Sequence, residues 1–258
     1  MILAIDSGNT HTTFGCVYDD NSVGNIFRLT TDISETEFGY AAKIKQIFDL
    51  YGVKPENFSG AVLSSVVPPM TNILKNAVKL FSGLDTLVVG AGVKTGLHLC
   101  INDPGTVASD LVSAAVGAKE EYPLPCIVVD LGTATTFTVV DEKGRYVGGA
   151  ILPGVGISLT SLSEKTALLP KIEITEPKNA IGANTIDCMK SGIIYGTAGA
   201  IDGMLSRIEK ELPCPVASIV ATGGYSSIIT PHCEHNISVD ETLLLKGLGI
   251  IFKRNQKN

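Results

Sequence analysis

Two short apolar runs, each ending in an aspartate, stand out in the pattern of hydrophobic and polar positions. Residues 2–5 lead into Asp6, residues 126–129 lead into Asp130, and in each copy a glycine follows two positions later. Such a run is typical of a buried strand that delivers a carboxylate to a tight turn. The copies start at positions 2 and 126, or 124 residues apart in a chain of 258, which indicates an internal repeat.

Both copies continue in the same way. Residues 12–18 and residues 135–140 are β-like, and each stretch reaches a turn signal rich in Asp, Asn, Lys or Gly before a third strand candidate. The sequence therefore predicts two related halves, each of which starts with a β-meander. We place the halves at residues 1–118 and 119–258.

Helical and strand patterns alternate after each meander. Ser34 and Glu37 have the spacing of a capping box, and Gly52 is a typical helix stop. The remaining elements are strands at 61–67, 86–89 and 218–221 and helices at 38–51, 71–81, 109–121, 186–208 and 241–252. This alternation predicts an α/β fold with mixed β-sheets flanked by helices.

Glycines interrupt the long helical pattern of residues 186–208 at four positions, namely Gly192, Gly196, Gly199 and Gly203. Because glycine costs helix stability, four of them indicate close packing against another backbone. That backbone can belong to the other half of the chain or to a second subunit.

Composition narrows the classes of protein. Hydrophobic residues make up 45% of the chain and charged residues 18%, which excludes a disordered or low-complexity protein. The net charge of −6 argues against a nucleic-acid partner. No apolar run has the ~20 residues of a membrane span, and the start of the chain lacks the pattern of a signal peptide. Six dispersed cysteines without a C-x-x-C pair favour a reducing cytoplasm.

The first aspartate begins a loop with phosphate-binding chemistry. We expect the exposed N–H groups and hydroxyls of this loop to surround phosphate oxygens, with Gly8 permitting a positive φ. Asp6 repels phosphate but can hold a hydrated Mg²⁺ that binds it. The loop comprises Asp6, Ser7, Gly8, Asn9, Thr10, His11, Thr12 and Thr13. An ordinary β-hairpin with an Asp-x-Gly turn is the alternative for a single copy.

The second copy, which runs from Asp130 through Gly132 and Thr133, favours the phosphate-binding interpretation. Two such loops form a clamp for the phosphates of a nucleotide. Gly223 and Gly224 follow the strand at 218–221, where they let an adenosine lie flat against the backbone. The order of these three elements resembles that of the actin, hexokinase and Hsp70 ATPase superfamily, which implies duplicated, ribonuclease H-like halves with ATP in a cleft.

A narrower resemblance runs over essentially the whole chain, which is similar to type III pantothenate kinases. It rests on segments at residues 6–10, 27–31, 130–137, 148–154, 166–170, 181–185 and 191–196. The resemblance implies transfer of phosphate from ATP to the primary hydroxyl of pantothenate, the first step towards coenzyme A. It also implies a homodimer that needs a monovalent cation, K⁺ or NH₄⁺.

The same resemblance implies roles for single residues. Asp130 would help to hold the monovalent cation, Thr133 would contact ATP and Thr185 would contact the acceptor. Asp110 would be the general base that takes the proton of the attacking hydroxyl. The acceptor motif of the family corresponds here to Ala108, Ser109, Asp110 and Leu111.

The acceptor side departs from the family pattern at two positions. Leu111 stands where the family has an arginine, and Ile101 stands where it has a tyrosine. Leucine offers no donor to a carboxylate or a phosphate. Three interpretations therefore stay open: a pantothenate kinase, a kinase of the same fold for another small alcohol, and a nucleotide-binding regulator without turnover.

Two features have plain structural explanations. Asp110 near a helix start is also a typical capping or solvated residue. The basic tail of residues 253–258 is expected to be a solvated terminus.

Overall fold

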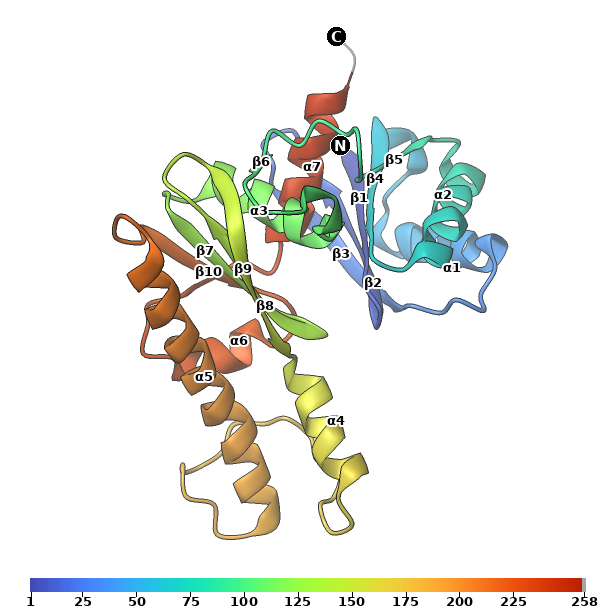
Figure 1. Cartoon of the computed structure of the whole chain (residues 1–258). Coiled ribbons are helices and arrows are strands. Elements are labelled where there is room, and N and C mark those ends of the chain that lie inside the picture. The colour runs from blue at the N-terminus through green and yellow to red at the C-terminus, as the bar shows by residue number, and fades with distance from the viewer. Residues whose placement is uncertain (257–258) are drawn as a thin grey trace. The chain divides into compact units, whose positions relative to one another are not determined.

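The computed structural model describes residues 1–256 (Figure 1). A five-stranded sheet in it carries Asp6, the first of the two repeated aspartates. Its strand order is β3-β2-β1-β4-β5, with β1 antiparallel to β2 and parallel to β4. The strands are β1 (Ile2–Ser7), β2 (His11–Val17), β3 (Val23–Thr30), β4 (Gly60–Ser65) and β5 (Thr86–Val88). The predicted meander is thus confirmed in the first half.

A second sheet repeats this order around the second aspartate. Its order is β11-β10-β7-β8-β9-β6, with β7 antiparallel to β8 and parallel to β10. The strands are β6 (His98–Leu99), β7 (Cys126–Leu131), β8 (Ala134–Val140), β9 (Arg145–Pro153), β10 (Ser218–Thr222) and β11 (Ser238–Val239). Because β9-β8-β7-β10-β11 reproduces β3-β2-β1-β4-β5, the internal repeat and the α/β fold class are confirmed.

Helices connect and cover the strands. They are α1 (Glu37–Tyr51), α2 (Pro68–Ser82), α3 (Ser109–Glu121), α4 (Val155–Lys165), α5 (Thr185–Glu211), α6 (Ser226–Ile229) and α7 (Leu243–Asn255), with 3₁₀ turns η1 (Pro55–Asn57), η2 (Pro104–Thr106) and η3 (Thr230–His232). The predicted bounds of α3 agree with the structure. The proline pair at 68–69 starts α2, since proline fits the first turn of a helix.

Backbone contacts divide the chain into two compact units. Unit 1 comprises Met1–His98, Asn102–Glu120 and the C-terminal segment from Thr242, and unit 2 comprises Leu99–Ile101 and Glu121–Glu241. The predicted halves, 1–118 and 119–258, are continuous in sequence, whereas these units are not. The difference arises because α7 packs on β1, β2 and β4.

Alternation along β1 buries both faces of the first sheet. Leu3 and Ile5 join the core that α1 and α2 complete on one face. On α7, which covers β1, β2 and β4, Leu245 approaches Gly15 so closely that a Cβ there would lie 2.8 Å from the leucine side chain. Strand β1 is therefore surrounded by protein until it reaches Asp6.

Helix α1 begins two residues later than a cap at Ser34 would place it. Thr36 is the N-cap, and its hydroxyl accepts a hydrogen bond from Gly39 N at 3.2 Å. Ser34 instead donates its hydroxyl to Asp32 at 2.6 Å, so the predicted capping box is wrong. The predicted stop is confirmed, because Gly52 adopts the left-handed conformation with φ 67°.

The long helix α5 packs on the core of unit 2 through one face, on which Ile193, Ala198 and Leu205 are buried. Its glycines lie elsewhere on the helix. A Cβ added to Gly192, Gly196 or Gly199 would meet open space in the described part of the chain. The expectation that these glycines pack against another backbone is therefore wrong within this chain.

Residues 253–255 of the basic tail form the last turn of α7 and bond to other segments of unit 1. Lys253 donates to Tyr18 O, Asp19 O and Asn21 Oδ1 at 2.7–3.2 Å. Arg254 donates to Thr95 O at 2.7 Å. The expectation of a solvated terminus is therefore wrong for residues 253–255, while residues 257–258 lie outside the described part. No helix of the described residues is both long and apolar enough to cross a membrane.

Candidate active site

The first predicted phosphate loop joins β1 to β2 in unit 1. Its turn is closed by a hydrogen bond from Gly8 N to His11 O at 3.0 Å. Gly8 is not among the described glycines with positive φ, so the turn does not use the conformational freedom expected of it. Asn9, Thr10 and His11 are exposed, which leaves the tip of the loop accessible to a ligand.

Two hydroxyls of this loop point into the protein. Ser7 and Thr12 are fully buried, and their hydroxyl oxygens lie 3.1 Å apart. Asp6 and Thr13 belong to the opposite face of the sheet, because side chains alternate along a strand. The buried hydroxyls thus support the loop from below, while Asp6 and Thr13 share the face that also carries Ser64.

The start of α3, which carries Asp110, is bonded to the strand next to Asp6. Asp6 of β1 is paired with Ser64 of β4, and Ser64 Oγ lies 3.0 Å from Ser109 Oγ at the start of α3. Ser109 also donates to Ser65 O at 3.4 Å. The predicted base is the next residue, Asp110. A pair of hydroxyls thus ties the start of α3 to the strand beside Asp6.

Asp110 has the electrostatics of a base. Burial raises the pKa of its carboxyl, since an ion loses hydration there, and the hydrogen bond from Leu111 N at 2.7 Å offsets part of this effect. A raised pKa makes the carboxylate a stronger proton acceptor. Asp110 is half-buried at the start of α3, so it is neither a fully solvated residue nor a core residue.

The second predicted phosphate loop lies in unit 2, next to the predicted adenosine segment. Gly223 has φ 88°, and a Cβ there would overlap the carboxylate of Asp130. Glycine is thus required at this position by both backbone conformation and close approach. Thr133 and Gly224 are exposed. The structure therefore brings Asp130, Thr133, Gly223 and Gly224 together within one unit.

The surroundings of Asp130 suit a cation with oxygen ligands. Thr136 is paired with Asp130 across β7 and β8, so both side chains lie on one face of the sheet. Thr136 Oγ1 is buried and has no hydrogen-bond partner among residues 1–256. A carboxylate beside an orphaned hydroxyl fits a monovalent cation. For Mg²⁺, the residue present in unit 1 is the strand-end carboxylate of Asp6.

The predicted acceptor residues fall in different units. Ala108, Ser109 and Leu111 surround Asp110 at the start of α3 in unit 1. Thr185 is the exposed first residue of α5 in unit 2. The cap of this helix is Asn184, whose side chain accepts a hydrogen bond from Asp187 N at 2.9 Å.

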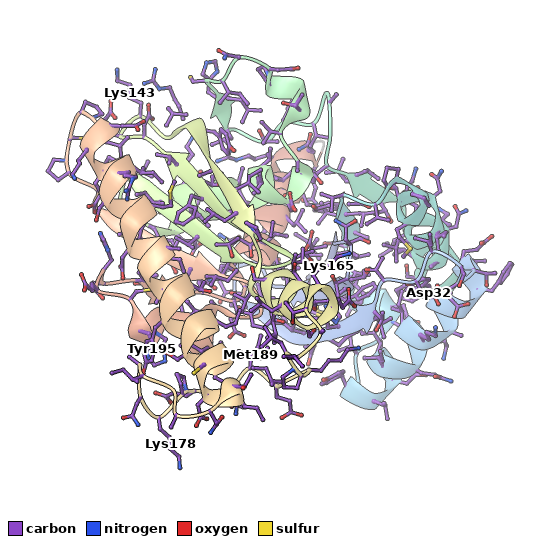
Figure 2. The ribbon with its side chains drawn as sticks, turned by 60° about the horizontal axis from the view of Figure 1, so that its bottom comes forward. Asp32, Lys143, Lys165, Lys178, Met189 and Tyr195 are labelled. Carbon is purple, nitrogen blue, oxygen red and sulfur yellow. The ribbon has the colours of Figure 1, made fainter. Side chains whose placement is uncertain are left out.

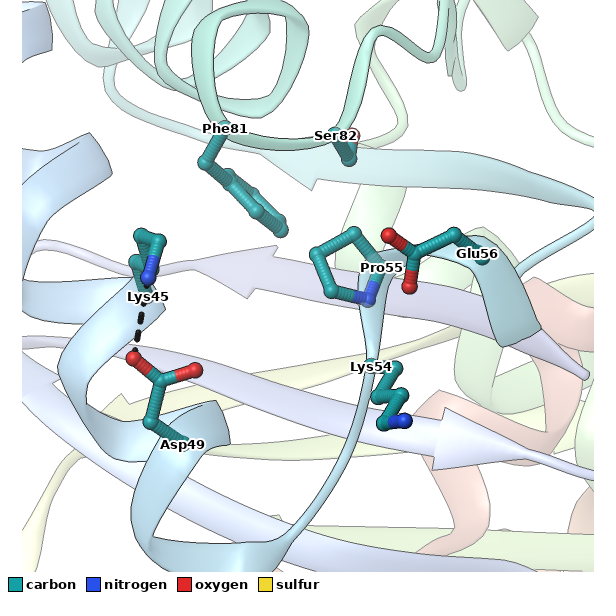
Figure 3. A pocket seen from close by; sticks show the side chains of 7 residues that line it. All are labelled: Lys45, Asp49, Lys54, Pro55, Glu56, Phe81 and Ser82. Carbon is teal, nitrogen blue, oxygen red and sulfur yellow. Dashed lines mark hydrogen bonds and ion pairs between the residues drawn. The ribbon is translucent and has the colours of Figure 1, made fainter.

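Two other features show no link to these loops. No group of His, Cys, Asp and Glu in residues 1–256 could hold a metal ion by itself, and His235 instead contacts Asp202 Oδ1 through Nδ1 at 2.6 Å. A hollow of about 510 Å³ in unit 1 is lined by equal numbers of lysines and acidic residues, and Lys45 pairs with Asp49 there (Figure 3). Its lining residues are Lys45, Asp49, Lys54, Pro55, Glu56, Phe81 and Ser82.

Comparison with known proteins identifies the family. The family model described as type III pantothenate kinase matches residues 2–207. The chain belongs to the type III pantothenate kinase family. Type III pantothenate kinases of Halalkalibacterium halodurans and Brevibacillus brevis are each 41% identical to it, over 99% of this chain and 100% of theirs. That of Syntrophobacter fumaroxidans is 38% identical over the full length of both chains.

Solved structures support the fold alone. A putative Baf family transcriptional activator from Campylobacter jejuni aligns with a TM-score of 0.62 and 19% identity over 98% of both chains. An activator of 2-hydroxyisocaproyl-CoA dehydratase from Clostridium difficile, solved with ADPNP bound, has a TM-score of 0.58 and 11% identity over 100% of this chain and 98% of its own. The predicted actin-like ATPase fold of this family member is thereby confirmed.

Sequence reasoning missed the residues that hold the site together. Ser64 and Ser65 gave no signal of their own, because their role depends on the pairing of β4 with β1. Thr136 lies within the segment 130–137 that carries the family resemblance, but only the strand register shows that it is paired with Asp130. Thr31 lies within the segment 27–31 of the same resemblance, and the sequence assigned it no role.

The raised pKa of Asp110 has a consequence for stability. A carboxyl with a higher pKa when folded costs stability once the pH exceeds its unfolded value, because the unfolded state ionises first. We therefore expect Asp110→Asn to raise the midpoint of thermal unfolding at pH 7. The gain should shrink as the pH falls below the raised pKa of the folded state and should vanish below the unfolded pKa of about 3.9. Equal midpoints for variant and wild type at pH 7 would show that burial of Asp110 is not costly.

Proposed function

We propose that this protein transfers the γ-phosphoryl group of ATP to the primary hydroxyl of pantothenate, yielding ADP and 4′-phosphopantothenate in the first step of coenzyme A biosynthesis. The observation that carries this proposal is the hydroxyl link between Ser64 and Ser109, which ties the start of α3, next to the base candidate Asp110, to the β4 residue that is paired with Asp6. Membership of the family supplies the acceptor.

The proposed ATP contacts come from the exposed part of the first loop and from Thr133, Gly223 and Gly224, while the buried Ser7 and Thr12 support the first loop from within. The tip of the first loop offers its backbone N–H groups and the Thr10 hydroxyl to phosphate, and Thr13 lies on the face of Asp6. In unit 2, Thr133 contacts phosphate while Gly223 and Gly224 form the adenosine segment. Mg²⁺, held through Asp6, neutralises charge on the phosphates when it is bound.

Asp110 accepts the proton in the transfer step. The pantothenate oxygen forms a bond to the γ-phosphorus, the bond from that phosphorus to the β–γ bridging oxygen breaks, and ADP leaves with the electron pair. The hydroxyl proton moves to the Asp110 carboxylate. Since phosphoryl transfer is loose, the main tasks of the protein are to position the hydroxyl and to exclude water.

The acceptor contacts come from Ala108, Ser109, Leu111 and Thr185. Leu111 is apolar, so it can pack against the aliphatic part of pantothenate but cannot pair with its carboxylate. Thr185 has a hydroxyl at the start of a long helix, where N–H groups favour an anion.

A monovalent cation, K⁺ or NH₄⁺, is held by Asp130. Its support is the buried Thr136 hydroxyl on the same face, which would gain a partner when the cation binds. The cation supplies positive charge near a polyanionic nucleotide, in a chain whose own net charge is −6.

The protein acts as a homodimer. Helix α5 leaves Gly192, Gly196 and Gly199 on an open face, while Met189 turns towards the core of unit 2 (Figure 2). Small residues allow the close approach of a second backbone. A monomer in sedimentation equilibrium at assay concentrations would contradict this assembly.

The cytoplasm is the proposed compartment. All six cysteines are free thiols in the structure, and burial raises the pKa of the Cys16 and Cys126 thiols to about 11. Such thiols stay protonated and unreactive in a reducing environment.

The role of Asp110 is tested by Asp110→Asn, which keeps the shape of the side chain but cannot accept the proton. We expect pantothenate-dependent release of ADP to fall by about 10²-fold or more, while the Kd of Mg-ATP measured by calorimetry stays unchanged. Glu120→Gln at the far end of the same helix is the matched control. Full activity in Asp110→Asn would remove this residue from the mechanism.

The cation site is tested by Thr136→Val, which removes the hydroxyl at nearly constant volume. The K⁺ concentration for half-maximal activity should rise about fivefold or more, since a ligand to the cation is lost. Thr138→Val, on the same strand and face but opposite Val128, should leave that concentration unchanged. Equal K⁺ responses of Thr136→Val and wild type would place the cation elsewhere.

A further inference from the structure

A chain of three hydroxyls lies beneath the first phosphate loop. Ser7 Oγ is 3.1 Å from Thr12 Oγ1, which is 3.0 Å from Thr31 Oγ1. Thr31 then donates to Gly8 O at 2.7 Å. Because Thr31 spends its single proton on Gly8, it accepts from Thr12, and Thr12 accepts from Ser7. The chain has one direction, and hydrogen bonds aligned in this way reinforce one another.

Thr31 is itself held firmly at the end of β3. Its backbone N–H donates to Thr10 O at 3.0 Å. The buried Tyr40 of α1 holds both neighbours, because its hydroxyl donates to Thr30 O at 3.2 Å and accepts from Asp32 N at 2.9 Å. Thr31 is therefore held in place by a buried residue of α1, and it bonds in turn to the loop.

These bonds restrain the groups of the loop that a phosphate would repel. Backbone carbonyl oxygens carry partial negative charge and disfavour an anion. Thr31 engages two of them, through its hydroxyl to Gly8 O and its amide to Thr10 O, and Gly8 N engages His11 O. A loop whose carbonyls are already bonded is preorganised to bind phosphate.

The second half of the chain offers an internal comparison. The strand registers make Ser7 equivalent to Leu131, Thr12 equivalent to Thr135, and Thr31 equivalent to Gly154. The second loop thus lacks both outer hydroxyls, and Thr135 Oγ1 is buried with no hydrogen-bond partner in the described residues. The closed hydroxyl chain is a property of the first loop and does not follow from the repeated strand pattern.

We propose that Thr31 is a positioning residue for ATP binding. Its hydroxyl holds the Gly8 carbonyl, and through it the loop of residues 6–13, in the shape that binds the phosphates. Thr31 acts through the loop, from the face of the sheet opposite to Asp6. This proposal rests on the proposed function of that loop.

The test replaces the Thr31 hydroxyl at nearly constant volume. We expect Thr31→Val to weaken binding of a non-hydrolysable Mg-ATP analogue about tenfold, measured by calorimetry, and to raise the KM for ATP by a similar factor. The KM for pantothenate should stay within about twofold of the wild-type value. Thr31→Ser, which keeps the donor, should restore ATP binding.

Thr30→Val is the matched control, since it makes the same change at an exposed neighbouring position of β3. Should Thr31→Val fail to fold in a thermal melt, Thr12→Val removes the hydroxyl that donates to Thr31 and should weaken ATP binding about threefold. Unchanged ATP binding in the folded variant would overturn the proposal, as would equal losses in Thr31→Val and Thr31→Ser. A wild type that binds no ATP analogue would instead overturn the function of the loop itself.

Discussion

The burial of a strand up to its final carboxylate is the constraint on which the rest of this structure depends. Leu3, Ala4 and Ile5 are completely inaccessible to solvent, and Asp6 is the first residue of β1 that begins to emerge. A shift of β1 by one residue would move the carboxylate of Asp6 into the fully buried place of Ile5 or Ser7, which opposes sliding of the strand. The carboxylate is therefore placed by the packing behind it, and the same holds for Asp130 at the end of β7.

The two copies of this arrangement have different supports. Below the first loop, side-chain hydroxyls reach up to a backbone carbonyl, as Thr31 does to Gly8. Around the second loop, glycines occupy the positions at which the chain makes its closest contacts. A Cβ on Gly154 would overlap the carbonyl of Thr133, and one on Gly223 would overlap Asp130. The first copy of the repeat thus has a loop restrained by hydroxyls, and the second copy has a carboxylate packed against glycine.

Local chemistry made much of the fold predictable. The bounds of α3, the stop at Gly52 and the repeated meander follow from short-range patterns of apolar and turn residues. The same patterns did not predict the environment of residues whose contacts lie far away in the sequence. Lys253 appeared to be a solvated tail residue because the turn at 18–21 that it contacts lies 232 or more residues away. Asp6 was identified from its own strand-and-turn motif and Asp110 through the family resemblance, but the link between them through Ser64 depends on strand register, which the sequence does not display.

The most direct test of the account is the mass of the product. Purified protein with Mg-ATP and K⁺ is incubated with pantothenate, and the reaction is analysed by mass spectrometry for a phosphorylated acceptor. We expect 4′-phosphopantothenate in a one-to-one ratio with ADP, which would show that Leu111 is compatible with this acceptor. ADP formed at the same rate without pantothenate, with the pantothenate recovered unchanged, would contradict it.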